Sequence, residues 1–251
     1  MKKRFYCLIL FLIGTLIFAD EKGYEIAKKN KELKKAIDSY SEAEMILIDK
    51  NGNQKKRKIV NYTKEGKEGK NSFVEFLEPA DVKGTKFLTI ARKGDDEQRL
   101  WLPALKKTRL IASSSKDAKF MGSDLYYYDM EDRDLDDFDY KYIKDDKTQN
   151  IDCFVIEATP KSKNAPYSRS FMWVSKNNYF IYKIEAYDKK DDKLLKTIVF
   201  VEVKEIQGVL VPTKTVVDNA KEGTKTLLSI TNIKINSGIK DDIFTVQNLE
   251  R

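Results

Sequence analysis

Few side chains in this 251-residue chain are suited to catalysis or to metal binding. It has no histidine and two cysteines, which excludes a Ser-His-Asp triad, a Cys-His pair and a His-ligated zinc site. The run Asp132–Asp136 begins like a calcium loop, but Asp137 stands where that loop needs glycine and Ile143 where it needs glutamate. No spacing singles out a glycosidase pair among the 40 acidic residues. We therefore predict no catalytic residue, no metal site and no cofactor, with a hydrolase as one alternative.

Apolar side chains that alternate along the chain are stronger candidates for function. Alternate residues of the run 180–186 are apolar, which places Phe180, Tyr182 and Ile184 on one face of a strand. The run Phe171–Val174 is apolar on both faces and predicts a strand covered on both sides. A single antiparallel sheet of roughly eleven strands must curl, and side chains or a ligand must fill its concave face. Because the sequence supplies one short helix for this task, we expect an apolar cavity, although a simple sandwich gives the same pattern.

The N-terminus has the layout of an export signal. Cationic residues 2–4 precede an apolar run from Phe5 to Phe18, and Ala19 is a small residue at a suitable cleavage position. We predict a signal peptide over residues 1–19 and a single domain over residues 20–251. An uncleaved anchor is the alternative, because Ile17 is large for its place before the cut. After cleavage Cys153 is the remaining cysteine, and its place in a strand pattern predicts buried packing.

The charge of the chain gives little support for nucleic-acid binding. The formal net charge is +7, and removing the three cationic residues 2–4 leaves 7 − 3 = +4. This excess is thinly spread and lacks a stripe of interleaved stacking aromatics. We predict no nucleic-acid partner and a lysine-rich, solvated surface.

The periodicity predicts one helix followed by strands. Ile26, Leu33 and Ile37 form a thin apolar stripe on a helix over Gly23–Asp38. Asn51-Gly52 between two strand-like runs predicts a hairpin, because both residues tolerate positive φ. The expected strands cover residues 45–48, 58–62, 72–77, 86–91, 98–102, 153–159, 169–174, 179–187, 196–205, 209–217 and 226–235. Short strands in close succession indicate an antiparallel meander, sandwich or barrel.

Three blocks between Phe76 and Met130 carry a family resemblance. They are FLEPADVKGTKFL at 76–88, LWLPALKKTR at 100–109 and FMGSD at 120–124. With them the sequence resembles the LolA-like family of outer-membrane lipoprotein-sorting proteins. The chain departs from the family pattern at Leu110, where a second Arg is usual, at Leu125, where Phe is usual, and at Met130, where Leu is usual. The ending 244–249 also fits the pattern.

The resemblance implies both a fold and a role. The implied fold is mainly β, an incomplete antiparallel barrel of about eleven strands around an apolar cavity, with helices as a lid. The implied role is a periplasmic carrier for the acyl chains of a lipoprotein or a lipid. Its partners would be that acylated cargo, an inner-membrane exporter and an outer-membrane acceptor. The residues expected at the cavity or its rim are Phe87, Leu100, Leu102, Arg109, Phe120, Met121, Leu125, Phe171, Trp173, Phe180, Tyr182 and Ile184.

Three further choices stay open. The same fold could serve a sensor or interaction module, in which a bound acyl chain or protein segment is a signal rather than cargo. The block Phe120–Asp124 could instead be a loop plug, with Gly122 in a strained φ/ψ and Asp124 capping backbone amides. Leu100 and Leu102 share a face and belong either to the core or to a cavity lining.

Overall fold

The computed structural model describes residues 14–251, with side chains from residue 21 onward. The cationic start and most of the apolar run of the predicted signal peptide lie outside the described residues. None of the helices within residues 14–251 has the length and hydrophobicity that a membrane crossing requires.

The described chain is mostly β-structure, with two α-helices and six short 3-10 turns. The helices are α1 (Gly14–Lys31) and α2 (Val246–Leu249). The strands are β1 (Asp38–Ile48), β2 (Gln54–Glu65), β3 (Lys70–Glu78), β4 (Lys86–Ile90), β5 (Glu97–Leu102), β6 (Lys107–Ile111), β7 (Phe138–Thr148), β8 (Ile151–Pro160), β9 (Tyr167–Ser175), β10 (Ile181–Asp188), β11 (Leu194–Ile206), β12 (Val209–Asn219) and β13 (Thr224–Ile235). The 3-10 turns are η1 (Pro103–Leu105), η2 (Ser113–Ser115), η3 (Phe120–Gly122), η4 (Tyr127–Met130), η5 (Leu135–Asp137) and η6 (Asp241–Phe244).

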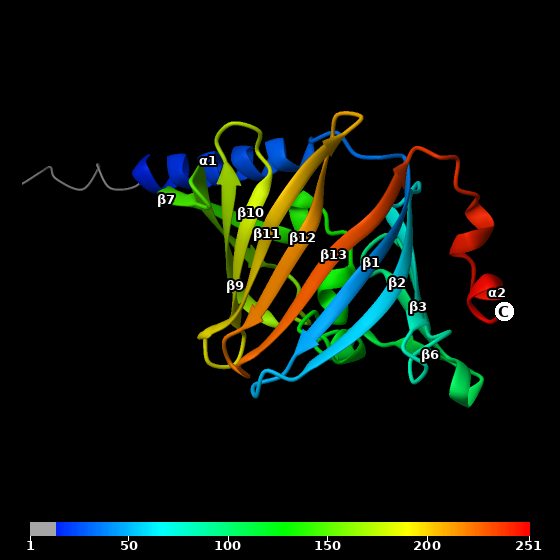
Figure 1. Ribbon diagram of the computed structural model, residues 1–251. Helices are drawn as coiled ribbons and strands as arrows, with labels where there is room; N and C mark the ends of the chain where they lie inside the picture. Colours follow the sequence, from blue (N-terminus) through cyan, green and yellow to red (C-terminus); the bar gives the residue numbers. More distant parts are fainter. Residues whose placement is uncertain (1–13) are drawn as a thin grey trace, which may run out of the picture.

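All thirteen strands form one antiparallel sheet that curls without closing (Figure 1). Its order is β6-β5-β4-β3-β2-β1-β13-β12-β11-β10-β9-β8-β7. Two meanders, β1–β6 and β7–β13, therefore join where β1 pairs with β13, with Met45 opposite Leu228. The edges β6 and β7 are not paired with each other, so the barrel is incomplete, as the resemblance implied.

The two edge strands are the ones that the sequence pattern missed. The eleven expected strands all exist, and β6 and β7 raise the number to thirteen. Both additional strands are rich in charged residues, and β7 alternates between half-buried and exposed side chains. Edge strands carry charged side chains because these discourage pairing with another chain, and those charges weaken the apolar signal that a pattern search needs.

Helix α1 lies across the opening of the curled sheet beside β7 (Figure 1). The expected helix, Gly23–Asp38, was wrong at both ends: α1 begins by Gly14 and ends at Lys31, and Asp38 already belongs to β1. Ile37, which the stripe placed on the buried face, is 67% exposed. The buried face instead contains Gly23, Ile26 and Ala27. A Cβ on Gly23 would lie 2.7 Å from the backbone of Lys141, so glycine permits the close approach to β7.

A long connection links the two edges of the sheet. Residues 112–137, which we call the crossover, leave β6 and return to the sheet at β7. Phe120 and Tyr127 of the crossover are buried against Phe76 and Phe87 of the sheet. The crossover thus connects the two edges of the sheet and also contributes side chains to the core inside the barrel.

Candidate functional site

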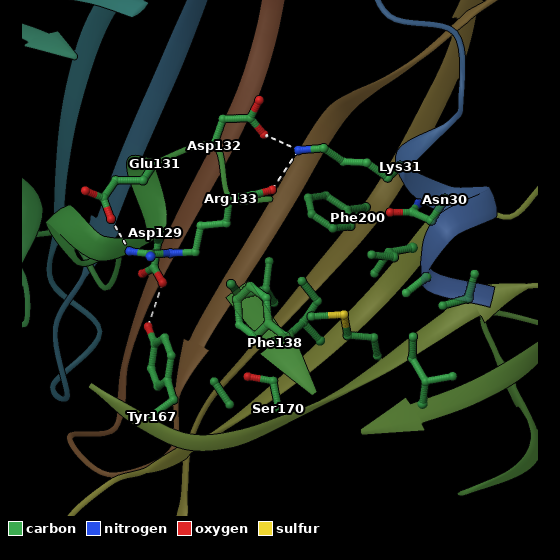
Figure 2. Close-up of a pocket in the computed structure, with 18 of the residues that line it drawn as sticks. Asn30, Lys31, Asp129, Glu131, Asp132, Arg133, Phe138, Tyr167, Ser170 and Phe200 are labelled. Atoms are coloured by element: carbon green, nitrogen blue, oxygen red, sulfur yellow. Dashed lines mark hydrogen bonds and ion pairs between the residues drawn. The ribbon is translucent and has the colours of Figure 1, made fainter. Parts of the chain in front are cut away.

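The sheet encloses a cavity of about 580 Å³ between its concave face, α1 and the crossover. We call it the main cavity; Figure 2 shows many of the residues that line it. The apolar lining comes from strands β7–β13, helix α1 and the crossover. Its members are Ala27, Leu125, Leu135, Phe138, Ile156, Met172, Val174, Ile181, Ile184, Ala186, Ile198, Phe200 and Leu228.

Two further hollows adjoin the main cavity. A second cavity of about 320 Å³ lies over strands β1–β3 and shares Leu125, Thr215 and Leu228 with the main cavity. A hollow of about 370 Å³ lies below the C-terminal end of α1, and we call it the vestibule. All three volumes lie in or near the range of about 300–1,000 Å³ typical of ligand pockets.

Charged residues of α1 and of the crossover meet at the rim of the main cavity. The Lys31 ammonium lies 3.3 Å from Asp132 Oδ1 and donates to the Arg133 carbonyl oxygen at 2.6 Å (Figure 2). Lys35 lies 3.9 Å from the same carboxylate. Burial alone would raise the pKa of Asp132, but Lys70, Lys31 and Lys35 outweigh it and hold the pKa below its usual value. These ion pairs join the helix to the crossover.

Asp124 fixes the middle of the crossover to the strands beneath it. Its carboxylate accepts hydrogen bonds from Thr226 at 2.8 Å, Thr224 at 2.5 Å and Asn219 at 3.2 Å. The side chain is 3% exposed, so these bonds replace the water that the carboxylate loses. Gly122 has φ +74°, so the backbone here takes a left-handed conformation that glycine tolerates best. The expected capping of backbone amides by Asp124 is wrong, because the partners of its carboxylate are side chains of β12 and β13 and the Lys119 ammonium at 3.4 Å.

A second anchor of the crossover is Asp129, which lies on the wall of the main cavity. The fully buried Lys196 of β11 donates to Asp129 Oδ2 at 2.5 Å, and the Tyr167 hydroxyl donates to Oδ1 at 2.6 Å. Burial lowers the pKa of Lys196, although the neighbouring Asp129 opposes this shift. Burial and Asp129 together hold the pKa of Tyr167 well above its usual value.

Glu131 is another charged residue of the crossover on this wall. Its carboxylate pairs with the buried Lys116 and with Arg133. Burial raises the pKa of Glu131, and the two cations act in the opposite direction. Asp129 and Glu131 are therefore both paired with cations of the structure. Within residues 14–251 no group of three or more acidic or cysteine side chains is arranged to hold a metal ion.

Comparison with known proteins places this geometry in a family. Over 92% of its length the chain is similar to an outer-membrane lipoprotein-sorting protein domain from Vibrio parahaemolyticus, at 32% identity and a TM-score of 0.89, and all of that domain is covered. The chain belongs to the LolA-like family of lipoprotein-sorting proteins. A family model described as "uncharacterized protein" matches residues 68–251.

Two other solved structures extend the comparison. A DUF1329 family protein from Desulfovibrio piger is 35% identical, with a TM-score of 0.87, over 92% of this chain and 99% of that one. A LolA superfamily protein from Nitrosomonas europaea shares the fold at a TM-score of 0.71 and 21% identity, over 90% of this chain and 98% of that one. No curated protein matches the chain.

Four of the expected site residues of this LolA-like chain line a hollow. Leu125 and Ile184 line the main cavity, Phe120 lines the second cavity together with Leu125, and Phe180 lines the vestibule. Leu125, which departs from the Phe expected from the family resemblance, lines both the main and the second cavity. It therefore lies on the boundary between the two.

Four other expected residues belong to packed core rather than to a cavity wall. Phe87 is fully buried and Leu100 is 5% exposed in one core cluster, against which Leu102 and Met121 pack. Met121 has φ +50°, and its carbonyl oxygen accepts a hydrogen bond from Arg57 at 2.5 Å. For Leu100 and Leu102 the structure thus favours the core over the cavity lining.

The remaining expected residues lie on other surfaces. Phe171 and Trp173 alternate with Met172 and Val174, which line the main cavity, so they point to the opposite face of β9. Tyr182 lines none of the three hollows. Arg109 is exposed on the edge strand β6 and lines none of the three hollows.

Cavity residues that the sequence pattern missed include Met172, Ile181 and Ile198. A register shift between Ile181 and Lys183 in the β9–β10 ladder places Ile181 on the same side as Ile184. Such a bulge breaks the period of two on which the face prediction depended. For β9, the run Phe171–Val174 is apolar on both faces, so its composition could not show which face meets the cavity.

Proposed function

We propose that this chain is a carrier that shields the acyl chains of a lipoprotein or a lipid while they cross the periplasm toward the outer membrane. The observation that carries the proposal is the main cavity, a hollow of about 580 Å³ lined largely by aliphatic and aromatic side chains. Membership of the lipoprotein-sorting family supports the same role.

The energetics of the cavity suit a hydrocarbon ligand. Each methylene that leaves water gains about 0.8 kcal/mol, so one acyl chain gains several kcal/mol in an apolar hollow. Met172, Ile184 and Ile198 remain only partly buried although they lie on the concave face. A bound acyl chain would complete the burial of these side chains.

The charged groups of the site support a carrier more than a hydrolase. Asp129 accepts hydrogen bonds from Lys196 and Tyr167, and Glu131 accepts from Lys116 and Arg133. General acid–base catalysis requires a group within hydrogen-bond reach of the substrate. The hydrogen-bond partners of these two carboxylates are side chains of the protein itself, and these contacts hold the crossover in place beside the hollow.

The cellular setting is part of the same proposal. The cationic residues 2–4 and the apolar run that follows them favour export from the cytoplasm. A carrier in the periplasm needs a donor and an acceptor, which we infer to be an inner-membrane exporter and an outer-membrane component.

A pair of variants on one strand tests the proposal. Ile198 lines the main cavity, whereas Val201, also β-branched and also on β11, is 49% exposed and lines none of the three hollows. An environment-sensitive apolar dye should bind the wild-type protein and be displaced by fatty acid. We expect Ile198→Asp to weaken dye binding at least about tenfold, because a buried carboxylate costs several kcal/mol. Val201→Asp should bind like wild type.

Two results would overturn the proposal. The first is a folded wild-type protein, checked by circular dichroism, that binds neither dye nor fatty acid. The second is an equal loss of binding in Ile198→Asp and Val201→Asp, which would place the apolar site outside the main cavity.

A further inference from the structure

The vestibule adjoins both apolar cavities. It shares Asn30, Lys35 and Asp132 with the main cavity. It shares Thr63, Lys70 and Pro212 with the second cavity. The two apolar cavities meet below it, where Leu125, Asp129 and Glu131 line both. One charged entrance therefore lies above two apolar compartments.

The lysines outnumber the carboxylates around the vestibule. Lys34, Lys35 and Lys70 line it, against Glu65 and Asp132. Lys31 adds a fourth ammonium 3.3 Å from Asp132, and Asp134, 3.7 Å from Lys31, adds a third carboxylate. Asp132 thus faces Lys31, Lys35 and Lys70 at once, which is why its pKa is lowered despite burial. The surplus positive charge at the entrance suits an anionic group.

The two compartments border the same fixed residues. Asp129 is held by Lys196 at 2.5 Å and by Tyr167 at 2.6 Å, and Glu131 by Lys116 and Arg133. Asp129, Glu131 and Leu125 line both the space over β7–β13 and the space over β1–β3, so they mark the boundary at which the two compartments meet. A ligand with one hydrocarbon chain can fill one compartment, whereas a ligand with two chains can fill both.

We propose that the natural ligand is an anionic glycerophospholipid with two acyl chains, one in the main cavity and one in the second cavity, and with its phosphate among Lys31, Lys35 and Lys70. This inference rests on the proposed carrier function and specifies its cargo. It predicts two separable preferences, one for charge at the vestibule and one for chain number below it.

Displacement of the bound dye measures the charge preference. Phosphatidylglycerol should displace dye from the wild-type protein at a concentration at least about fivefold lower than phosphatidylcholine with the same chains, at low salt. Lys70→Glu should abolish that difference, because it replaces a vestibule cation by an anion. The control is Lys55→Glu, which makes the same charge change at the opposite end of β2 from Thr63 and Glu65. Lys55 is ten residues from Glu65 along β2, and at about 3.3 Å per residue this distance exceeds the screening length of about 10 Å at 0.1 M salt. The charge change at Lys55 should therefore have little effect at the vestibule.

Displacement by lipids of different chain number measures the second preference. Phosphatidylglycerol should bind wild type more tightly than its single-chain lyso form. Ala43 lines the second cavity, so Ala43→Phe should fill that compartment and remove the advantage of two chains. Binding of the lyso lipid, which needs the main cavity alone, should stay as in wild type.

The outcomes separate this inference from the proposed function. If no lipid or fatty acid displaces the dye, the proposed carrier function itself is contradicted. Equal displacement by both headgroups, or the same loss in Lys70→Glu and Lys55→Glu, overturns the anionic entrance while leaving a carrier. A lyso lipid that binds as tightly as the diacyl lipid overturns the two-chain assignment.

Discussion

Two regions of the same sheet are filled in opposite ways. Over β3–β5 the crossover inserts Phe120 and Tyr127 against Phe87, with ring centroids 5.0 and 5.5 Å from that of Phe87. Over β8–β12 the same crossover presents Leu125 and charged residues that pair with buried lysines, and a cavity of about 580 Å³ remains. We call these the packed region and the hollow region.

The difference shows how a curled sheet can keep a cavity without losing its shape. In the packed region, buried aromatic rings of the crossover contact those of the sheet, and this packing holds the crossover in place. In the hollow region, ion pairs and hydrogen bonds hold the crossover in place instead. Such contacts leave space between the crossover and the sheet that packed aromatic rings would fill. A stable core and an open binding space thus lie side by side.

The largest expected effect comes from the buried ion pair at the border of the two regions. Lys196 is 1% exposed and holds Asp129 and the Asp124 carbonyl, so Lys196→Ala leaves a buried carboxylate without its cation. We expect the free energy of unfolding to fall by about 3–5 kcal/mol in urea titrations. The control, Lys225→Ala, removes an exposed pair with Asp218 and should cost less than about 1 kcal/mol. Equal small losses would contradict the structural role of Lys196.

Truncation of one large side chain in each region compares their packing directly. Phe120→Ala should lower the free energy of unfolding by about 3–5 kcal/mol, since it removes a ring that is 1% exposed among other aromatics. Met172→Ala should cost less than about 2 kcal/mol, because Met172 already borders empty space and has fewer contacts to lose. Urea unfolding of both variants measures the difference. A larger loss for Met172→Ala would mean that the hollow region is packed.

Enlarging a side chain should have opposite consequences in the two regions. Ser170 lines the main cavity, so Ser170→Leu should raise the free energy of unfolding by about 0.5–1 kcal/mol and weaken dye binding. Leu100 is 5% exposed in the packed region, and Leu100→Phe should cost about 1–3 kcal/mol by overpacking. Thermal unfolding and dye titration of the same samples test both. Destabilisation by both variants would contradict a free volume beside Ser170.

The smallest effect is the pH dependence of the contact between α1 and the crossover. The folded-state pKa of Asp132 lies below its usual value of 3.8, so the stabilisation by this carboxylate is present above that value and is lost as the pH falls through the folded pKa. Wild type should exceed Asp132→Asn by about 1 kcal/mol or less at pH 6, since the pair is partly exposed. This difference should shrink as the pH falls below 3.8 and through the lower folded-state pKa, as unfolding titrations at each pH can measure. A difference that grows with acidity would contradict the assignment.

Much of the fold could be predicted from the sequence, because strong alternation marks the buried strands and Asn51-Gly52 marks the first hairpin. In that hairpin Gly52 has φ +84° and Asp49 accepts from the backbone amides of Asn51 and Asn53. The edge strands β6 and β7 were not predicted, because exposed edge strands have charged side chains and lack the regular alternation of apolar residues.

The site could be predicted only in part. Leu125, Phe120, Ile184 and Phe180 line hollows, but the bulge in β10 changed which residues share a face. Which apolar residues fill the core and which line a cavity depends on where the crossover inserts its aromatic side chains. That placement is set by long-range partners, such as Thr226 for Asp124 and Lys196 for Asp129, and no local pattern contains them.

A crystal structure of the protein bound to a fatty acid with a bromine atom on its chain would test the central claim most directly. Bromine gives an anomalous signal that locates the hydrocarbon chain without any assumption about its path. The signal should appear inside the main cavity, beside Met172, Ile184 and Ile198. A signal confined to the outer surface, with the cavity filled by side chains of the protein itself, would contradict the carrier function.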